Sequence, residues 1–230
     1  KENLEKGIVL EKTKIVICSP FIYLDKLTKI RTNKIKLGAQ NAFLEDVGAY
    51  TGEISSSMLY NIGIKYVILG HSERRMLGET NMLVNKKVKA SLGAGLWPIL
   101  CVGESARDEN HDYFKFIQTQ VVESLDGVSK ESLSKIIIAY EPIWSISTTP
   151  NRKDAAPRDS EEMALFIKKT LVDKFGAKIK MPKIVYGGDV NKKNVLDFLK
   201  DGGVEGVLIG RASLDASKFT EIINIAESIS

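Results

Sequence analysis

The sequence contains 230 residues, of which 43% are hydrophobic and 27% are charged, and these proportions are typical of a folded globular protein rather than a disordered one. The 33 basic residues exceed the 29 acidic ones by a formal net charge of +4 and are scattered along the chain, so nothing indicates a nucleic-acid partner. No apolar run approaches the roughly 18 residues that a membrane span needs. We therefore expect a cytoplasmic protein that binds neither membrane nor nucleic acid.

Short apolar runs rich in valine and isoleucine recur along the chain and predict strands. They lack a clean alternation of polar and apolar residues, which is typical of strands buried on both faces of a parallel sheet. The predicted strands are Ile15–Cys18, Ile35–Leu37, Tyr66–Leu69, Trp97–Val102, Ile136–Tyr140, Ile184–Tyr186 and Val207–Ile209.

Helical spacing of apolar residues lies between several of these runs. It predicts helices over Asn81–Leu92, Tyr113–Leu125, Asp159–Phe175 and Asn191–Lys200. Asp159 with Glu162 three residues later is close to a capping box, and glycines follow Lys200 closely, as they often follow a helix end. Because strands and helices alternate without a break in composition, we predict one domain over residues 1–230 with right-handed crossovers.

Two architectures fit this alternation, a (β/α)₈ barrel and an open doubly wound sheet. A barrel needs eight strands, and the sequence predicts seven. Residues Asn3–Val9 have the pattern of the end of a helix rather than of a strand. The favoured prediction is therefore an α/β protein with a (β/α)₈ barrel, with the first strand and most of the first helix absent from this chain.

The two cysteines, Cys18 and Cys101, each lie inside an apolar run, which predicts buried free thiols in a reducing compartment. With two histidines as the only other soft ligands, no metal site is predicted.

Functional residues in parallel α/β folds gather where strands end and loops begin. His71 follows a predicted strand at Gly70, where an imidazole can polarise a carbonyl or transfer a proton; a surface histidine on a charged turn is the alternative. Glu141 follows a buried strand directly, where partial desolvation raises a carboxyl pKa toward that of a useful base. An ordinary carboxylate in a salt bridge is the alternative there.

Glycines follow the last two predicted strands. Gly187 and Gly188 open the turn before the helix predicted at Asn191, and Gly210 ends the run Val207–Ile209. Glycine lets backbone N–H groups approach an anion, and phosphate sites after the seventh and eighth strands recur in barrels. The two turns together predict an anion site.

Taken together, these segments resemble the triosephosphate isomerase family. The resemblance is carried in order by GAQN (Gly38–Asn41), GAYTGEIS (Gly48–Ser55), YVILGHSERR (Tyr66–Arg75), LCVGE (Leu100–Glu104), AYEPIW (Ala139–Trp144), YGGDV (Tyr186–Val190) and GRASL (Gly210–Leu214). The combination of GHSERR with AYEPIW is highly specific, and the motifs extend over nearly the whole chain.

The resemblance implies interconversion of dihydroxyacetone phosphate and D-glyceraldehyde 3-phosphate through an enediol, in glycolysis and gluconeogenesis, by a cytoplasmic homodimer without a cofactor. Glu141 matches the catalytic base, His71 the electrophile and Glu73 the acid behind the site. Thr51 matches a residue that reaches the neighbouring subunit's active site, and Gly210 matches a phosphate-binding glycine.

The sequence departs from the family pattern in four places. The family's first strand carries an Asn and a Lys that bind substrate, and neither is found here. In the altered lid loop, Ser147 offers a backbone N–H and a hydroxyl; Asp189 replaces the phosphate-binding serine, and Arg211 replaces a glycine of the phosphate turn. Asp189 either points into the anion site or caps the helix predicted at Asn191; we favour capping, with Arg211 neutralising the remaining charge.

Two alternative functions remain at this stage. One is a catalytically impaired or dead barrel that is kept for binding, and the other is an isomerase of a related phosphorylated sugar. Turnover of glyceraldehyde 3-phosphate distinguishes them from the main interpretation.

Overall fold

The computed structural model describes residues 11–30, 34–146, 149–150 and 152–229. The strands there form one parallel sheet in the order in which they occur in the chain. They are β1 (Ile15–Ser19), β2 (Ile35–Ala39), β3 (Tyr66–Leu69), β4 (Trp97–Val102), β5 (Ile137–Tyr140) and β6 (Lys183–Tyr186). Each strand pairs with the next, so this sheet has no reversal of strand order, and the doubly wound alternative is wrong.

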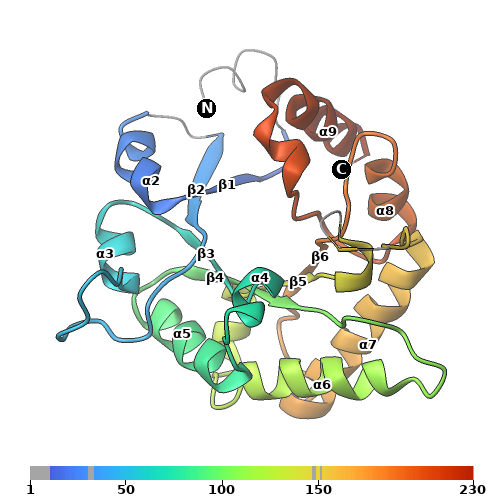
Figure 1. Ribbon diagram of the computed structural model, residues 1–230, viewed down its shortest axis with the longest axis horizontal. Coiled ribbons are helices and arrows are strands. Elements are labelled where there is room, and N and C mark those ends of the chain that lie inside the picture. Colours follow the sequence, from blue (N-terminus) through green and yellow to red (C-terminus); the bar gives the residue numbers. More distant parts are fainter. Residues whose placement is uncertain (1–10, 31–33, 147–148, 151, 230) are drawn as a thin grey trace.

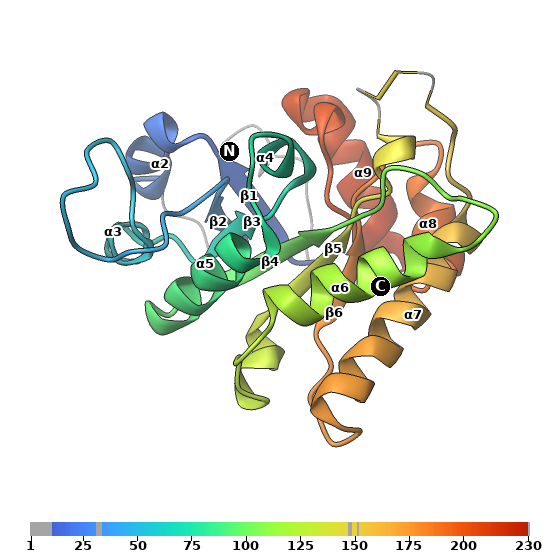
Figure 2. The ribbon, with the colours of Figure 1, turned by 60° about the horizontal axis from the view of Figure 1, so that its bottom comes forward.

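The helices are α2 (Phe21–Thr28), α3 (Ser56–Asn61), α4 (Ser72–Met76), α5 (Asn81–Gly93), α6 (Asp112–Ser124), α7 (Pro157–Phe175), α8 (Val195–Asp201) and α9 (Ala216–Ile229), with short 3-10 helices η1 (Glu131–Lys135), η2 (Ile143–Ser145) and η3 (Arg211–Leu214). Most of the helices lie around the outside of the curled sheet, whereas α4 lies near the middle of the view in Figure 1 and above the sheet in Figure 2. From α5 to α9, each helix packs on the next.

Apolar side chains cover both faces of the sheet. In β4, Leu100 and Val102 join the large cluster that contains the helix residue Ile117, whereas Ile99 and Cys101 join a second cluster with residues of the neighbouring strands. Alternate residues of one strand thus enter two different clusters, which explains why its sequence is apolar throughout. The prediction of strands buried on both faces is confirmed here.

The seventh predicted strand, Val207–Ile209, is wrong as a strand. Val207 forms an isolated bridge with Tyr186, and the Leu208 N–H donates to the Tyr186 carbonyl oxygen at 2.8 Å. The segment lies between Gly206 and Gly210 and has β6 as its one paired neighbour among the described residues. A short segment that is hydrogen-bonded along one side makes too few consecutive bridges to be a strand.

The first two predicted helices are confirmed as α5 and α6, with ends that differ by one residue. The third begins two residues before the predicted Asp159, because Pro157 occupies its first position, where proline's missing N–H costs nothing. The Asp159 side chain accepts the Ala156 N–H at 2.8 Å. Asp159 therefore caps α7 from inside the first turn, and Glu162 is not part of a capping box.

The helix predicted from Asn191 begins instead at Val195. The Asn194 side chain accepts the Asn191 N–H at 2.8 Å, and the Asn191 side chain accepts the Lys193 N–H at 2.9 Å. Asparagine side chains that bind nearby backbone groups compete with helix formation, and here they hold three residues as a turn.

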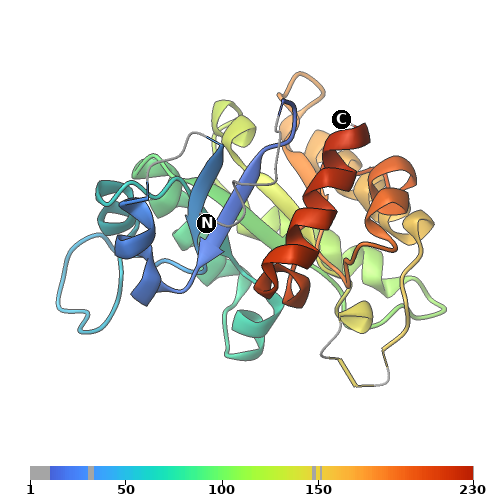
Figure 3. The ribbon, with the colours of Figure 1, turned by 90° about the horizontal axis from the view of Figure 1, so that it is seen from above.

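The C-terminal helix lies beside the first strand (Figure 3). Ile223 of α9 packs with Ile15 and Ile35. The Glu227 carboxylate accepts the backbone N–H groups of Glu11, Lys12 and Thr13 at 2.7–3.0 Å. Hydrogen bonds from Thr13 and from these N–H groups lower the pKa of Glu227 to about 2.

The sequence predicts that the chain lacks the first strand of a barrel. Residues 3–9 lie outside the described part of the chain, so the expected absence of a first strand is not confirmed.

Both cysteines are free thiols; Cys101 is buried and Cys18 is half-buried, and burial raises the pKa of Cys18 to about 12. None of the helices described here is long and apolar enough to cross a membrane.

Candidate active site

The carboxyl ends of three adjacent strands present the polar side chains at the centre of the candidate site. His71 follows β3 after Gly70, Glu104 lies two residues beyond β4, and Glu141 follows β5 directly. Because the strands are parallel and neighbouring, these residues emerge at one edge of the sheet. The sequence-predicted pair, His71 and Glu141, is brought into contact there.

The Glu141 carboxylate lies between the ring of His71 and the start of α4. Its Oε1 is 3.3 Å from His71 Nε2, and its Oε2 accepts the Ser72 N–H at 3.1 Å. The side chain of Glu141 is 2% exposed, whereas that of His71 is 30% exposed. One oxygen of a buried carboxylate is thus fixed by the backbone, and the other faces an imidazole at the solvent boundary.

The local backbone selects the tautomer of His71. The ring occupies the N-cap position of α4, and its Nδ1 accepts the Glu73 N–H at 3.3 Å. A nitrogen that accepts a hydrogen bond carries no proton, so the proton lies on Nε2, which faces the site. Neutral His71 is therefore a hydrogen-bond donor toward Glu141 or toward a ligand.

Burial raises the pKa of Glu141. Neighbouring His71, the Ser72 N–H, the Cys101 thiol and the Arg75 guanidinium oppose this rise without cancelling it. Desolvation disfavours the charged carboxylate and makes it a stronger base when it is ionised. The prediction that a strand-end position raises the pKa of Glu141 is confirmed.

A second buried carboxylate, Glu104, was not singled out from the sequence. Its Oε1 accepts hydrogen bonds from Tyr140 Oη and Trp144 Nε1, both at 2.8 Å, and lies 3.3 Å from Arg107 Nε. The signal that found Glu141, an acid directly after a buried strand, applies equally to Glu104. This network fixes Trp144 of η2, the short helix from which the next segment departs.

Residues 146–156, between η2 and α7, are the segment for which the sequence predicts a lid, and the structure describes 146, 149–150 and 152–156 of it; we refer to it as the lid segment. Its two ends are joined where the Lys153 N–H donates to the Trp144 carbonyl oxygen at 3.1 Å and the Ala155 N–H donates to Ser145 Oγ at 3.0 Å. Ser147, the predicted phosphate ligand in this segment, lies outside the described residues.

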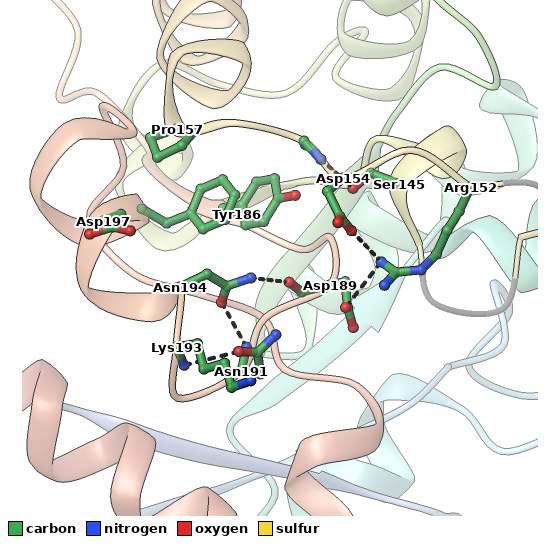
Figure 4. A pocket seen from close by; sticks show the side chains of 12 residues that line it. Ser145, Arg152, Asp154, Pro157, Tyr186, Asp189, Asn191, Lys193, Asn194 and Asp197 are labelled. Atoms are coloured by element: carbon green, nitrogen blue, oxygen red, sulfur yellow. Dashed lines mark hydrogen bonds and ion pairs between the residues drawn. The ribbon is translucent and has the colours of Figure 1, made fainter.

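Asp189 follows the two glycines of the turn after β6, and its carboxylate does not cap a helix. Its Oδ2 accepts from Arg152 Nη1 of the lid segment at 3.1 Å, and its backbone carbonyl accepts from Asn194 Nδ2 at 2.7 Å (Figure 4). The predicted capping role is therefore wrong, because α8 begins six residues beyond Asp189. The cation in contact with this carboxylate is Arg152, where the sequence had suggested Arg211.

The other predicted site residues lie at the edges of this arrangement. Gly210 precedes η3, with nothing within 4 Å of the place where a Cβ would be, and Arg211 begins that helix on the surface. Glu73 is 70% exposed, with its carboxylate 3.8 Å from His71 Nδ1. Thr51 lies in an exposed turn between β2 and α3, far along the chain from the other site residues.

Comparison with known proteins places the chain in a family. The sequence model of the family described as "Triosephosphate isomerase" matches residues 2–226. The chain belongs to the triosephosphate isomerase family. The resemblance stated from the motifs is thereby confirmed, and the matched region contains both His71 and Glu141.

Named relatives extend over nearly all of the chain. A triosephosphate isomerase of Caldanaerobacter subterraneus is 44% identical over 218 residues, which are 93% of this chain and 86% of the relative. One of Dehalococcoides mccartyi is 45% identical over 233 residues, which are 100% of this chain and 88% of the relative. One of Thermoanaerobacter pseudethanolicus is 43% identical over 227 residues, 97% of this chain and 90% of the relative.

Proposed function

We propose that this protein interconverts dihydroxyacetone phosphate and D-glyceraldehyde 3-phosphate. The observation that carries the proposal is the contact of Glu141 Oε1 with His71 Nε2 at 3.3 Å, between a buried carboxylate of raised pKa and a neutral imidazole. A base and a hydrogen-bond donor at this spacing can act on adjacent atoms of one small substrate.

The two residues have complementary tasks in this reaction. Glu141 removes a proton from the carbon next to the carbonyl, and the Nε2–H of His71 donates a hydrogen bond to the carbonyl oxygen, where negative charge develops. His71 then helps to move a proton between the two oxygens of the enediol. Protonation of the neighbouring carbon by Glu141 completes the isomerisation; this acid–base pairing is the one known for the family.

None of these proton transfers requires a redox cofactor, because a proton leaves one carbon and another enters the next while the substrate keeps its electrons. Within the described residues, no group of three or more His, Cys, Asp or Glu side chains is placed to hold a metal ion. The lid segment is expected to exclude water from the enediol, which otherwise loses its phosphate.

Four finer statements belong to the same proposal. The curled sheet with outer helices is an arc of a (β/α)₈ barrel, and the chain forms one domain, as its large apolar cluster from Leu24 to Ile222 supports. The protein works in the cytoplasm; its two free cysteines support this location, because the cytoplasm keeps thiols reduced. It pairs as a homodimer through the turn at Thr51 and Gly52, whose exposed tip is supported by the ring contact of Phe43 with Tyr50 at 4.7 Å.

Turnover by the full chain tests the proposed activity directly. Wild-type protein should convert glyceraldehyde 3-phosphate, and Glu141→Gln, which keeps the shape but removes the base, should lose about 10² to 10⁴ in kcat. Glu131→Gln in η1, exposed at the opposite edge of the sheet, is the matched control and should match wild type. A folded wild-type protein without turnover would support the dead-barrel alternative, and turnover restricted to another phosphorylated sugar would support the related isomerase.

A further inference from the structure

The turn that holds Asp189 forms one wall of the proposed active site. The Gly187 N–H donates to the Tyr140 carbonyl oxygen at 2.7 Å, and a Cβ on Gly187 would come within 2.9 Å of Glu141 Cγ. Asp189 lies two residues further along the same turn. A phosphorylated substrate whose carbon reaches Glu141 would extend its dianion along this turn, toward Asp189.

Arg152 contacts two carboxylates, and the two contacts differ in their surroundings. Its Nη1 lies 3.1 Å from Asp189 Oδ2 and 3.0 Å from Asp154 Oδ1. The side chain of Asp189 is 31% exposed and that of Asp154 is 86% exposed. Water screens the exposed pair strongly, so the positive charge of Arg152 acts mainly on Asp189.

Both ends of this ion pair are fixed by the backbone around them. Arg152 precedes Lys153, whose N–H closes the base of the lid segment on Trp144. The backbone of Asp189 is held by Asn194 Nδ2 at 2.7 Å. Figure 4 shows the guanidinium of Arg152 reaching from the lid segment toward Asp189 across the pocket that these residues line.

We propose that Arg152 is a positioning residue for the phosphate end of the substrate, because it neutralises Asp189 and so lets an anion bind beside a carboxylate. The proposal rests on the proposed function for the identity of the substrate. The ion pair joins Arg152, which follows η2 in the chain, to the turn after β6. Without Arg152, Asp189 repels a dianion and leaves the proton chemistry at Glu141 unaffected.

The test compares Arg152→Gln, Asp189→Asn and the double variant with wild type. Arg152→Gln should raise KM for glyceraldehyde 3-phosphate about tenfold, which is about 1.4 kcal/mol of binding, with kcat within about twofold. Asp189→Asn alone should lower KM, because it leaves the positive charge of Arg152 uncompensated beside the anion. The double variant should return to a KM near that of wild type, because both charges of the pair are absent. Arg158→Gln, an exposed arginine in α7, is the matched control.

Calorimetric titration with inorganic phosphate separates this proposal from the proposed function, because it needs no turnover. Phosphate affinity should follow the same order, with Arg152→Gln weakest. If wild type binds phosphate in this pattern without isomerising the triose, the activity is wrong and the role of Arg152 stands.

Two results would overturn the role of Arg152. One is an Arg152→Gln variant that melts at a lower temperature but keeps wild-type KM and phosphate affinity, which would mean a structural role alone. The other is an Arg152→Gln, Asp189→Asn double variant that binds phosphate as weakly as Arg152→Gln, which would mean that Arg152 does not act by neutralising Asp189.

Discussion

The two halves of the proposed active site are built in different ways. The proton-transfer half, His71 and Glu141, follows paired strands and has buried, backbone-fixed contacts. The anion half, around Asp189 and Gly210, lies on turns after β6 and after a segment with a single bridge, and its ion pair is one-third exposed. Residues that must hold a reacting carbon within tenths of an ångström come from the most rigid elements, whereas charge on a phosphate is recognised by turns that tolerate substitution.

Shortening the base should produce the largest effect in either half. In Glu141→Asp, the carboxylate withdraws by one methylene from the substrate carbon, and a misplacement of about 1 Å costs about 10²-fold in kcat. Steady-state kinetics on protein with an unchanged melting temperature measures this. A kcat near that of wild type would show that Glu141 is not the base. It would also contradict the claim that the proton-transfer half depends on exact positioning.

A pair of glycine substitutions compares the packing of the two halves. A Cβ on Gly103 would collide with the Glu141 carbonyl oxygen, whereas nothing lies within 4 Å of a Cβ on Gly210. Gly103→Ala should cost about 3 kcal/mol or more of unfolding free energy, and Gly210→Ala should stay within about 0.5 kcal/mol. Urea denaturation measures the free energy of unfolding of both variants. Equal losses would contradict the difference in packing around the two glycines.

Much of this arrangement was predictable from the sequence, and the failures have physical causes. Apolar runs such as Tyr66–Leu69 and Trp97–Val102 predicted strands because both faces of the sheet are buried. Val207–Ile209 has the same composition, but composition does not show how many neighbours a strand will have. The alternation of strands and helices predicted the α/β class and a strand-end site, but it fitted both a barrel and a doubly wound sheet, and the strand order in the structure excluded the second.

The site residues also divide into those that local sequence places and those that only tertiary structure brings together. His71 and Glu141 were predictable because their position follows from the end of the preceding strand. The partner of Asp189 was not, because Arg152 lies 37 residues away on a different turn and only tertiary structure brings the two together. Glu104 carried a similar strand-end signal. Of its three donors, Arg107 lies three residues away in the chain, whereas Tyr140 and Trp144 lie 36 and 40 residues away and reach it only in the folded protein.

Removing one donor from Glu104 should have a moderate effect on stability. Trp144→Phe deletes the indole N–H at 2.8 Å from a buried carboxylate, and hydrogen bonds to charged groups contribute about 1.5 to 3 kcal/mol. We expect the lower end of that range, because Tyr140 and Arg107 still contact the same oxygen. Chemical denaturation checks this; an unchanged free energy of unfolding would mean that η2 is held by packing alone.

The smallest expected effect is a dependence of stability on pH. Burial raises the pKa of Glu141 above its ordinary value of 4.5, so the folded state binds the proton more tightly than the unfolded state does. The resulting stability is complete below pH 4.5 and is lost as the pH rises through the folded pKa. Glu141→Gln should therefore become more stable relative to wild type as the pH rises from 4.5 toward neutrality. A constant difference between the two across this window would contradict the raised pKa.

Exchange of substrate hydrogen with solvent tests the central claim, that Glu141 carries the transferred proton, most directly. A proton held on the carboxyl group of Glu141, beside the partly exposed His71, can exchange with water, whereas a hydride that moves between carbons does not. In D₂O, wild-type protein should form product with deuterium on the newly protonated carbon, detected by NMR, and Glu141→Gln should form neither product nor deuterated substrate. Turnover without deuterium, or deuterium incorporation that survives in Glu141→Gln, would contradict the account.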